Sequence, residues 1–501
     1  MTAVGYQYVI EQLGLQLIPL TRPATLRSVT RMEEMSGLLA VPGEMAPSPT
    51  ILGHLLFALK HEGTNLQVLA AAAPSLAPAN LLAEIRRTPT GRYIRTLCFA
   101  WEKLTGKTLE DLPAGIMQAK AAPLFDPELY LTNTGVSRDP RWRVLCNGLG
   151  DWDFCPIVRR TKELDALLSE NPLEQVRAYL AQVPPATLER VLAWAYLHET
   201  RSSYEIEHEN PSGNKAEAFT KLLRQAHTRH ELTEEFYVEL QNAVVTSPYA
   251  VESSFRLNQN HLSDGTPGPR GVTYVPPPVA MLPSLTGGIS RLANSDSCAG
   301  IEPLLRAALV SFGFVFTHPF NDGNGRLSRF LAHYALCQSG ALPNGLILPL
   351  STAMKRNERQ YLQALQSFSV HARKLWNVIW LDGPNFEFEL KGHESIYRYF
   401  DATDAVEFIA RMALETLSTD LHSEVDFLAC YDEVARATND RFDVPGITLA
   451  NLIVMAFQNG GTFSQNRRKQ YRDQVDPAAM DFIEQELQSA LRKIGAPVTE
   501  A

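Results

Sequence analysis

One short stretch of the chain gathers side chains that together could bind a polyphosphate and move a proton beside it. It reads Thr317-His-Pro-Phe-Asn-Asp-Gly-Asn-Gly-Arg-Leu-Ser-Arg329. Glycines at 323 and 325 let the backbone approach a ligand closely, and the free amides at the start of a following helix form an anion site. Arg326 and Arg329 lie three residues apart on that helix, so they share a face and reach the same polyanion.

Two other side chains of the same stretch supply further chemistry. Asp322 offers a hard carboxylate oxygen for Mg²⁺, the metal that accompanies nucleotide phosphates. His318 closes the preceding apolar segment, and the ordinary pKa of histidine suits a general base near neutral pH. The stretch lacks the GK[ST] of a P-loop and the spacing of a dinucleotide fingerprint. The residues therefore predict a magnesium–phosphate cradle beside a proton acceptor.

The elements that must position this stretch are predicted to be helices. Apolar residues 304–316 indicate a buried helix before it, and residues 327–337 indicate a second helix after it. The chain is strongly helical in pattern from about 172 to 370, apart from a Gly- and Pro-rich piece at 258–283 that favours a hairpin. The tail from about Leu375 also has helical patterns. The fold class is predicted to be mainly α.

Composition narrows the class of protein. The chain has 501 residues, with 46 Lys and Arg against 55 Asp and Glu, a net charge of −9, which argues against a generally basic nucleic-acid binder. Its six cysteines form no CxxC pair and no zinc-like cluster, so we expect free thiols in a reducing compartment. The N-terminus has no signal-peptide pattern and no apolar run is long enough for a bilayer. We expect a cytoplasmic protein that does not enter a membrane.

The stretch from His318 to Arg329 resembles the signature of Fic-domain proteins, HxFx[DE]GNGRxxR, with every specified position filled. The resemblance covers about residues 185–370. It implies an all-helical core that transfers a nucleotide monophosphate, usually AMP from ATP, to a hydroxyl side chain of a target protein. His318 would deprotonate that hydroxyl, Asp322 would hold Mg²⁺, and Arg329 would bind the γ-phosphate. The remaining phosphate contacts would come from Gly323, Asn324, Gly325 and Arg326.

The resemblance also divides the chain into three parts. A mostly helical N-terminal domain of unknown role would cover 1–175, the Fic catalytic domain 176–372, and a C-terminal helical domain 373–501. Within the catalytic domain, residues near 268–286, with Tyr274-Val-Pro-Pro-Pro278 and Leu282-Pro-Ser-Leu285, resemble the family's hairpin flap. Its target-positioning residues would be Tyr274, Val275 and Pro276, which hold the target by strand addition. An ordinary Pro-rich turn remains the alternative.

Two more residues downstream resemble the family's adenine-side contacts. Asn357 and Tyr361 lie four apart on a helix pattern, although Tyr361 could equally be a core aromatic.

An inhibitory motif is also suggested upstream of the flap. Residues near 196–210 are similar to the family's inhibitory helix, [ST]xxxE[GN], with Ser203 and Glu207 in the expected positions. Glu207 would pair with Arg329 in place of the γ-phosphate, because a carboxylate and a phosphate oxygen compete for one guanidinium. The sequence departs from the motif at His208, where Gly or Asn is expected. A solvated, polar helix end is the alternative.

The expected ligands are ATP with Mg²⁺, and the expected partner is a protein target that the sequence does not identify. Self-modification and a homodimer are further expectations. Three other functions stay open: a hydrolase that removes AMP at the same site, transfer of another phosphate-containing group, and a non-catalytic module that binds a nucleotide or a partner. The intact His318 argues against the last, because a binding module needs no base there.

Overall fold

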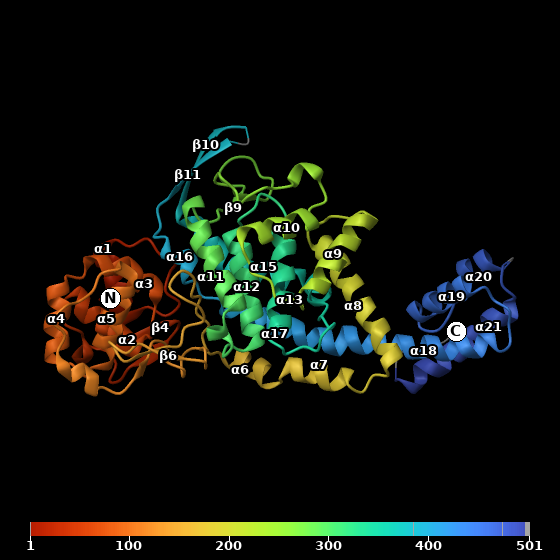
Figure 1. Ribbon diagram of the computed structural model, residues 1–501, viewed down its shortest axis with the longest axis horizontal. Helices are drawn as coiled ribbons and strands as arrows, with labels where there is room; N and C mark the ends of the chain where they lie inside the picture. The colour runs from red at the N-terminus through yellow and green to blue at the C-terminus, as the bar shows by residue number, and fades with distance from the viewer. Residues whose placement is uncertain (1, 384, 473, 496–501) are drawn as a thin grey trace.

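A computed structural model describes residues 2–383, 385–472 and 474–495. Figure 1 shows three parts along the long axis of the molecule: an N-terminal part at one end, a central helical mass, and a small C-terminal cluster at the other end. Helices dominate and the strands are few and short, so the mainly α prediction is confirmed.

The N-terminal part combines helices with two small sheets. The first sheet has strand order β1-β2-β4-β3, in which β2 and β4 are parallel and the other pairs antiparallel. The second sheet has strand order β5-β7-β6. The helices of the N-terminal part are α1 (Gly5–Leu13), α2 (Ile51–His61), α3 (Leu66–Ala72), α4 (Pro78–Arg87) and α5 (Arg92–Thr105). Its strands are β1 (Ala3–Val4), β2 (Ala24–Arg27), β3 (Glu33–Met35), β4 (Leu38–Pro42), β5 (Ala122–Pro123), β6 (Ser137–Arg138) and β7 (Val144–Cys146).

The centre of the molecule is built on two buried helices. α12 (Pro303–Thr317) and α13 (Asn324–Gln338) pack along each other and are joined by residues 318–323. Nearly every residue of both is buried, because the two helices lie inside a shell of other helices. α12 is apolar on nearly all sides, whereas α13 also buries Arg326, Arg329 and His333. Both helices were expected from the sequence. The shell contains α8 (Pro185–Ile206), α9 (Gly213–Gln225), α10 (Glu234–Val244), α11 (Leu282–Asn294), α14 (Leu350–Arg356), α15 (Glu358–Lys374) and α17 (Thr403–Glu415), with α6 (Lys162–Ser169), α7 (Pro172–Leu180) and α16 (Ser395–Arg398) beside it.

The flap is a hairpin of β8 (Leu262–Ser263) and β9 (Val272–Tyr274), antiparallel to each other. This confirms the expected β run, but the assignment of Leu282–Leu285 to the flap was wrong. Those residues form the first turn of α11, where Pro283 is tolerated because a first-turn residue has no intrahelical amide bond to lose.

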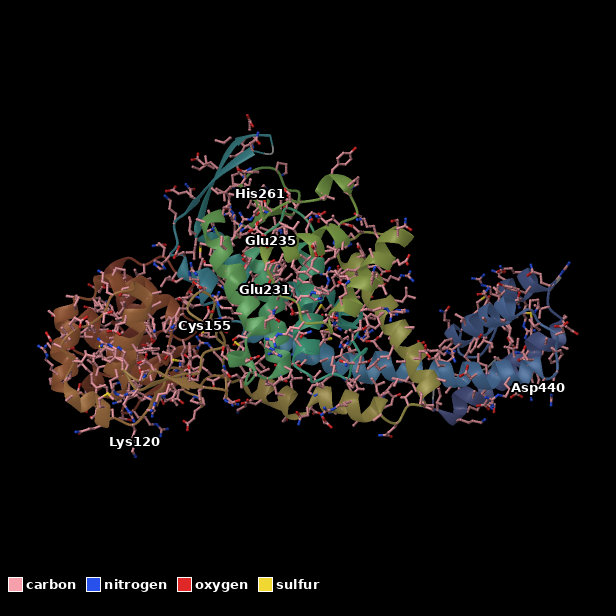
Figure 2. All side chains as sticks on the ribbon, viewed as in Figure 1. Lys120, Cys155, Glu231, Glu235, His261 and Asp440 are labelled. Atoms are coloured by element: carbon pink, nitrogen blue, oxygen red, sulfur yellow. The ribbon has the colours of Figure 1, made fainter. Side chains whose placement is uncertain are left out.

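A second hairpin follows the core, where the sequence had suggested helices. β10 (Trp376–Asp382) pairs with β11 (Asn385–Leu390). The helical expectation was wrong there, because Phe386-Glu-Phe-Glu-Leu390 alternates with the period of a strand. Trp376 is buried with Val272 of the flap, and the ring of His261, labelled in Figure 2, packs against Phe386 and Phe388.

The tail leaves the core through one long helical rod. α17 continues through a π-helical turn at 416–421 into α18 (His422–Asn439), which extends toward the C-terminal cluster in Figure 1. That cluster contains α19 (Gly446–Gln458), α20 (Gln465–Tyr471) and α21 (Pro477–Lys493), and has its own hydrophobic core.

The main hydrophobic core is continuous from the N-terminal part into the helices around α12 and α13, and its residues run from Tyr6 to Leu428. The segment near residue 400 is hydrogen-bonded to the N-terminal part: the carbonyl oxygen of Arg398 accepts a hydrogen bond from Cys155 N at 2.9 Å. The boundaries at 175 and 372 therefore stay predictions. All six cysteines are free thiols. Among the described residues, no single helix is long and apolar enough to cross a membrane; only the sharply bent pair 66–75 and 78–87 meets that test of length and composition.

Candidate active site

The loop between α12 and α13 is held in a fixed shape by its own residues. Gly323 precedes α13 with a φ of 86°, a left-handed conformation that glycine adopts without strain. The Asn324 side chain receives a hydrogen bond from Phe320 N at 3.0 Å and donates one to Phe320 O at 2.8 Å. Phe320 is fully buried. Asn324 therefore fastens the loop with its side chain, which leaves its backbone amide at the start of the helix.

His318 is presented to this loop as a neutral base. Its imidazole is buried, and Nδ1 lies 3.3 Å from the carbonyl oxygen of Val315. A carbonyl only accepts, so we infer that Nδ1 carries the hydrogen and that Nε2 is left as a proton acceptor. Burial lowers the pKa of His318 to about 4, although the Val315 contact opposes this shift. At neutral pH the ring is therefore uncharged and able to take a proton.

Arg256 connects the histidine to the flap. Its Nε donates to His318 O at 3.0 Å, and its Nη2 donates to Pro277 O at 2.5 Å. The guanidinium thus fixes the end of α12 against the segment that follows β9. Sequence reasoning missed this residue, because no motif marks an arginine that binds only backbone carbonyls.

The structure brings the three residues of the expected inhibitory contact together. Arg329 Nη2 donates to Glu207 Oε1 at 2.8 Å and to Ser203 O at 2.7 Å, and Nε donates to Ser203 Oγ at 2.9 Å. The pKa of Glu207 is lowered: its burial acts to raise it, but the charge and hydrogen bond of Arg329 outweigh that effect. Glu207 is therefore ionised at neutral pH.

The Glu207 carboxylate lies over the first turn of α13. A Cβ placed on Gly325 would come within 2.1 Å of Glu207 Oε1, so only glycine lets the carboxylate approach this closely. In this part of the described chain no side chain caps α13, and its first amides and its dipole favour an anion. Arg329 Nη1 is buried and has no partner among the described residues. The site therefore offers more positive charge and more hydrogen-bond donors than one carboxylate uses, so it could bind a larger anion.

Arg326 lies in a second ion-pair network that the sequence did not reveal. Its Nη1 donates to Glu209 Oε2 at 2.7 Å and to Val244 O at 3.1 Å, and its Nη2 donates to Asp322 Oδ1 at 2.9 Å. The guanidinium is almost fully buried and lies over the ring of Tyr204. Arg326 therefore binds three groups of the protein itself, whereas a phosphate contact had been expected. Glu209 was missed because its place depends on where α8 ends.

The end of α8 explains the unusual residue in the inhibitory motif. His208 has a φ of 57°, and Glu209 N donates to Tyr204 O at 3.1 Å, which closes the helix. Gly and Asn adopt this left-handed conformation readily, and other residues do so at a cost. His208 therefore preserves the backbone path that the motif's Gly or Asn would give, and Glu207 still reaches Arg329.

Asp322 can supply one ligand to a magnesium ion. Its Oδ1 accepts from Gly323 N at 2.6 Å and from Arg326, while the side chain is 42% exposed. Among the described residues there is no group of three or more His, Cys, Asp or Glu that could hold a metal. A single carboxylate fits Mg²⁺ when substrate phosphates supply further oxygens, so the donor set is compatible with magnesium–ATP.

The other two expected nucleotide contacts, Asn357 and Tyr361, are engaged within the protein. The Asn357 amide donates to Glu415 Oε2 at 2.7 Å and to Ala353 O at 2.9 Å, so its donors are already used. Tyr361 is buried and stacks on Phe408. Burial raises the pKa of Tyr361, and the nearby charge of Arg329 acts in the opposite direction.

In the flap, Tyr274 Oη donates to Phe316 O at 2.6 Å, and Val275 and Pro276 are buried. These three side chains anchor the hairpin, and Thr273 is the exposed residue of β9. Any strand addition at the flap would therefore use its backbone.

The comparisons with known proteins match this region of the chain. The Fic/DOC family model matches residues 231–336, which include α10, α11, α12, the loop and most of α13. A protein adenylyltransferase fic-1 from Caenorhabditis briggsae is 31% identical over 132 residues, 26% of this chain and 24% of the relative. The Caenorhabditis elegans protein of the same name is 42% identical over 59 residues, 12% of this chain and 11% of that one. Protein adenylyltransferase Fic from Drosophila ananassae is 32% identical over 120 residues, 24% and 22% of the two chains.

Solved structures give a weaker likeness. A Fic family protein from Desulfovibrio desulfuricans aligns over 68% of this chain and 90% of its own, with a TM-score of 0.37 and 15% identity. The fold and the loop define a mainly helical protein in which a neutral histidine, a carboxylate and two buried arginines meet at one helix junction. By the family-model match, residues 231–336 of this chain are similar to the Fic/DOC family and carry a Fic domain. The chain spans about a quarter or less of the length of the curated relatives it matches.

Proposed function

We propose that this protein transfers AMP from ATP to a hydroxyl side chain of a target protein. The observation that carries the proposal is a neutral, buried imidazole near the start of α13. Among the residues that the structure describes, its Nε2 is free, no side chain caps α13, and Nη1 of Arg329 has no partner. The relatives named protein adenylyltransferase support the same activity.

In the proposed reaction the target's hydroxyl oxygen attacks the α-phosphorus of ATP. The new bond joins that oxygen to the α-phosphorus, and the bond from the α-phosphorus to the bridging oxygen breaks, so pyrophosphate leaves with the electron pair. His318 Nε2 takes the hydroxyl proton. The amides of the α13 first turn and Arg329 stabilise the phosphate charge, which is the main requirement of such a transfer. Magnesium held by Asp322 would supply neutralising charge to the phosphates.

We further propose that Glu207 inhibits the enzyme. Its carboxylate lies where the arginine and the helix start would otherwise receive phosphate oxygens. ATP must compete with this built-in anion for Arg329, so basal activity should be low. As a proposal from its free thiols, we place the protein in a reducing compartment such as the cytoplasm.

The test uses ATP labelled at either phosphate. The purified chain is incubated with Mg²⁺ and α-labelled or γ-labelled ATP, and labelled protein is measured for the parent, for His318→Ala, and for His61→Ala as a matched control in the N-terminal part. Label from α-labelled ATP, lost only in His318→Ala, supports the proposal. Label from γ-labelled ATP instead would make the enzyme a kinase, and α-label that survives in His318→Ala would refute the base. Release of AMP from modified protein, with no transfer from ATP, would favour the hydrolase.

A further inference from the structure

A second polar cavity lies at the opposite end of the α12–α13 pair from the loop. It has a volume of about 160 Å³. It lies between the end of α11, the first turns of α12 and the end of α13, and it includes the short turn at 296–298. The side chains that matter most to its chemistry are those of Arg229, Asn294, Asp296, Arg306 and Gln338.

Arg306 differs from the other buried arginines in what it binds. Arg95 donates to three carbonyl oxygens, at 2.7, 2.9 and 3.1 Å, and Arg256 also donates to three. Arg306 is only 6% exposed, yet among the described residues its guanidinium makes a single hydrogen bond, from Nη2 to Ala335 O at 3.5 Å, the limit for such a bond.

Within the described chain no carboxylate lies within 4.0 Å of the Arg306 guanidinium, and its Nε has no partner. A buried cation without a partner is costly, so the protein gains if an anion is bound there.

The remaining polar groups of the cavity are already engaged. The Asn294 amide donates to His230 O at 2.8 Å and its oxygen accepts from Tyr334 Oη at 2.8 Å. Gln338 Nε2 donates to Ala226 O at 2.8 Å. The nearby Glu302 is used in capping α12, through Leu305 N at 2.8 Å. These groups therefore cannot pair with Arg306 without breaking existing bonds.

Arg229 supplies a second cation at the mouth of the cavity. Its Nη2 donates to Asn294 O at 2.6 Å and lies 3.5 Å from Asp296 Oδ1. The Asp296 side chain is 96% exposed, so this ion pair is a loose, solvated one. An incoming anion could replace Asp296 at Arg229 at little cost.

We propose that this cavity binds a small oxyanion of the phosphate class between Arg306 and Arg229. A guanidinium presents paired N–H donors that match phosphate oxygens, and two arginines lining one cavity can neutralise the charge of a dianion. A cavity of this size has room for a phosphate group or a small phosphomonoester. The site is independent of the proposed adenylyl transfer, because it shares no residue with the loop at 318–329.

The test titrates inorganic phosphate into the full chain at constant ionic strength, followed by calorimetry and by thermal unfolding. The parent should bind one phosphate and gain melting temperature. Arg306→Met should weaken binding at least about tenfold, as expected for the loss of charge-assisted hydrogen bonds. Arg229→Gln should weaken it about two- to fivefold, as for an exposed ion pair. Arg224→Gln, an exposed arginine of α9 outside the cavity, should bind as the parent does.

Three results would overturn the proposal. The first is that the parent binds no phosphate, and the second is that both cavity variants bind it as tightly as the parent does. Binding lost only in Arg329→Met would place the phosphate at the loop. If Arg306→Met does not fold, as judged by circular dichroism, the exposed Arg229 variant decides. Glycerol phosphate and succinate separate the ligand classes. Binding of the phosphomonoester supports the proposal, and tighter binding of succinate contradicts the phosphate class.

Discussion

The two ends of the α12–α13 pair both bury arginines, but they differ in where the neutralising anions come from. At the loop end, Arg329 binds Glu207, and Arg326 binds Glu209 and Asp322. At the far end, Arg306 has one long contact to a carbonyl and no carboxylate partner among the described residues. One helix pair thus carries an anion site that the protein fills itself and another that it leaves for a ligand.

The difference shows how a buried arginine can be interpreted. An arginine whose two terminal nitrogens both donate to backbone carbonyls, such as Arg95, is structural. An arginine paired with a carboxylate over an uncapped helix start marks a site where that carboxylate competes with a ligand. A buried arginine with almost no partner indicates that the ligand comes from outside. Four predictions concern the loop end, and the one on His208 concerns the helix end that brings Glu207 to it.

The largest effect should come from removing the base. His318→Ala should lower AMP transfer by about 10²–10⁴-fold, because the hydroxyl proton then has no positioned acceptor. Arg306→Met, at the other end of the same helix, should leave the transfer unchanged in phosphate-free buffer. Rates measured with α-labelled ATP give both values. Equal losses in the two variants would mean that α12 as a whole, and not the imidazole, limits the rate.

Removal of the internal anion should have the next largest effect. Glu207→Gly should raise AMP transfer by about ten- to a hundredfold, the range expected when one charge-assisted hydrogen bond no longer competes with substrate. The control is Glu205→Gly, which removes a nearby carboxylate of α8 that pairs with Arg201. Labelling assays on the purified variants report the difference. A rise in both variants would attribute the effect to a loosened helix.

The pH dependence should separate the buried imidazole from an ordinary histidine. Its pKa is lowered to about 4, so the neutral, active form persists as pH falls and is lost only near that value. In the Glu207→Gly background, which removes the neighbouring carboxylate, the acid limb of the rate profile should therefore lie well below pH 6. Initial rates between pH 4.5 and 8 test this. A rate that falls with a midpoint near 6.5 would show a solvated histidine.

The smallest effect concerns the backbone at the end of α8. His208 has a left-handed conformation, which costs a residue with a side chain about 1–2 kcal/mol. Glycine avoids this cost, but it loses more backbone entropy on folding, which offsets part of the gain. His208→Gly should therefore stabilise the fold by about 0.5–1 kcal/mol, and His208→Val should destabilise it. Urea unfolding midpoints measure both. A less stable glycine variant would show that the His208 side chain makes a stabilising contact.

Local patterns predicted much of the site because its residues are close in sequence. The loop at 318–329 and its two helices follow from a dense motif and from apolar runs. Glu207 and Ser203 were placed by their spacing in a second motif. Contacts between distant segments were not predictable in this way: Glu209 lies 117 residues before Arg326, and the two meet only because α8 ends with a left-handed turn at His208.

Other features were hidden for different reasons. The β10–β11 hairpin was missed although its alternating residues were visible. Arg306 lies within a run that indicates a buried helix, and no sequence pattern tells that its guanidinium lacks a partner, since this depends on how the ends of α11, α12 and α13 meet.

The most direct test of the central claim compares the binding of ATP and ADP. If Glu207 stands in for the γ-phosphate at Arg329, its removal should matter only to the ligand that has this phosphate. Calorimetry in the His318→Ala background, where turnover is prevented, should show that Glu207→Gly tightens ATP binding at least about tenfold and leaves ADP binding nearly unchanged. Equal changes for the two nucleotides, or no change for ATP, would contradict the account.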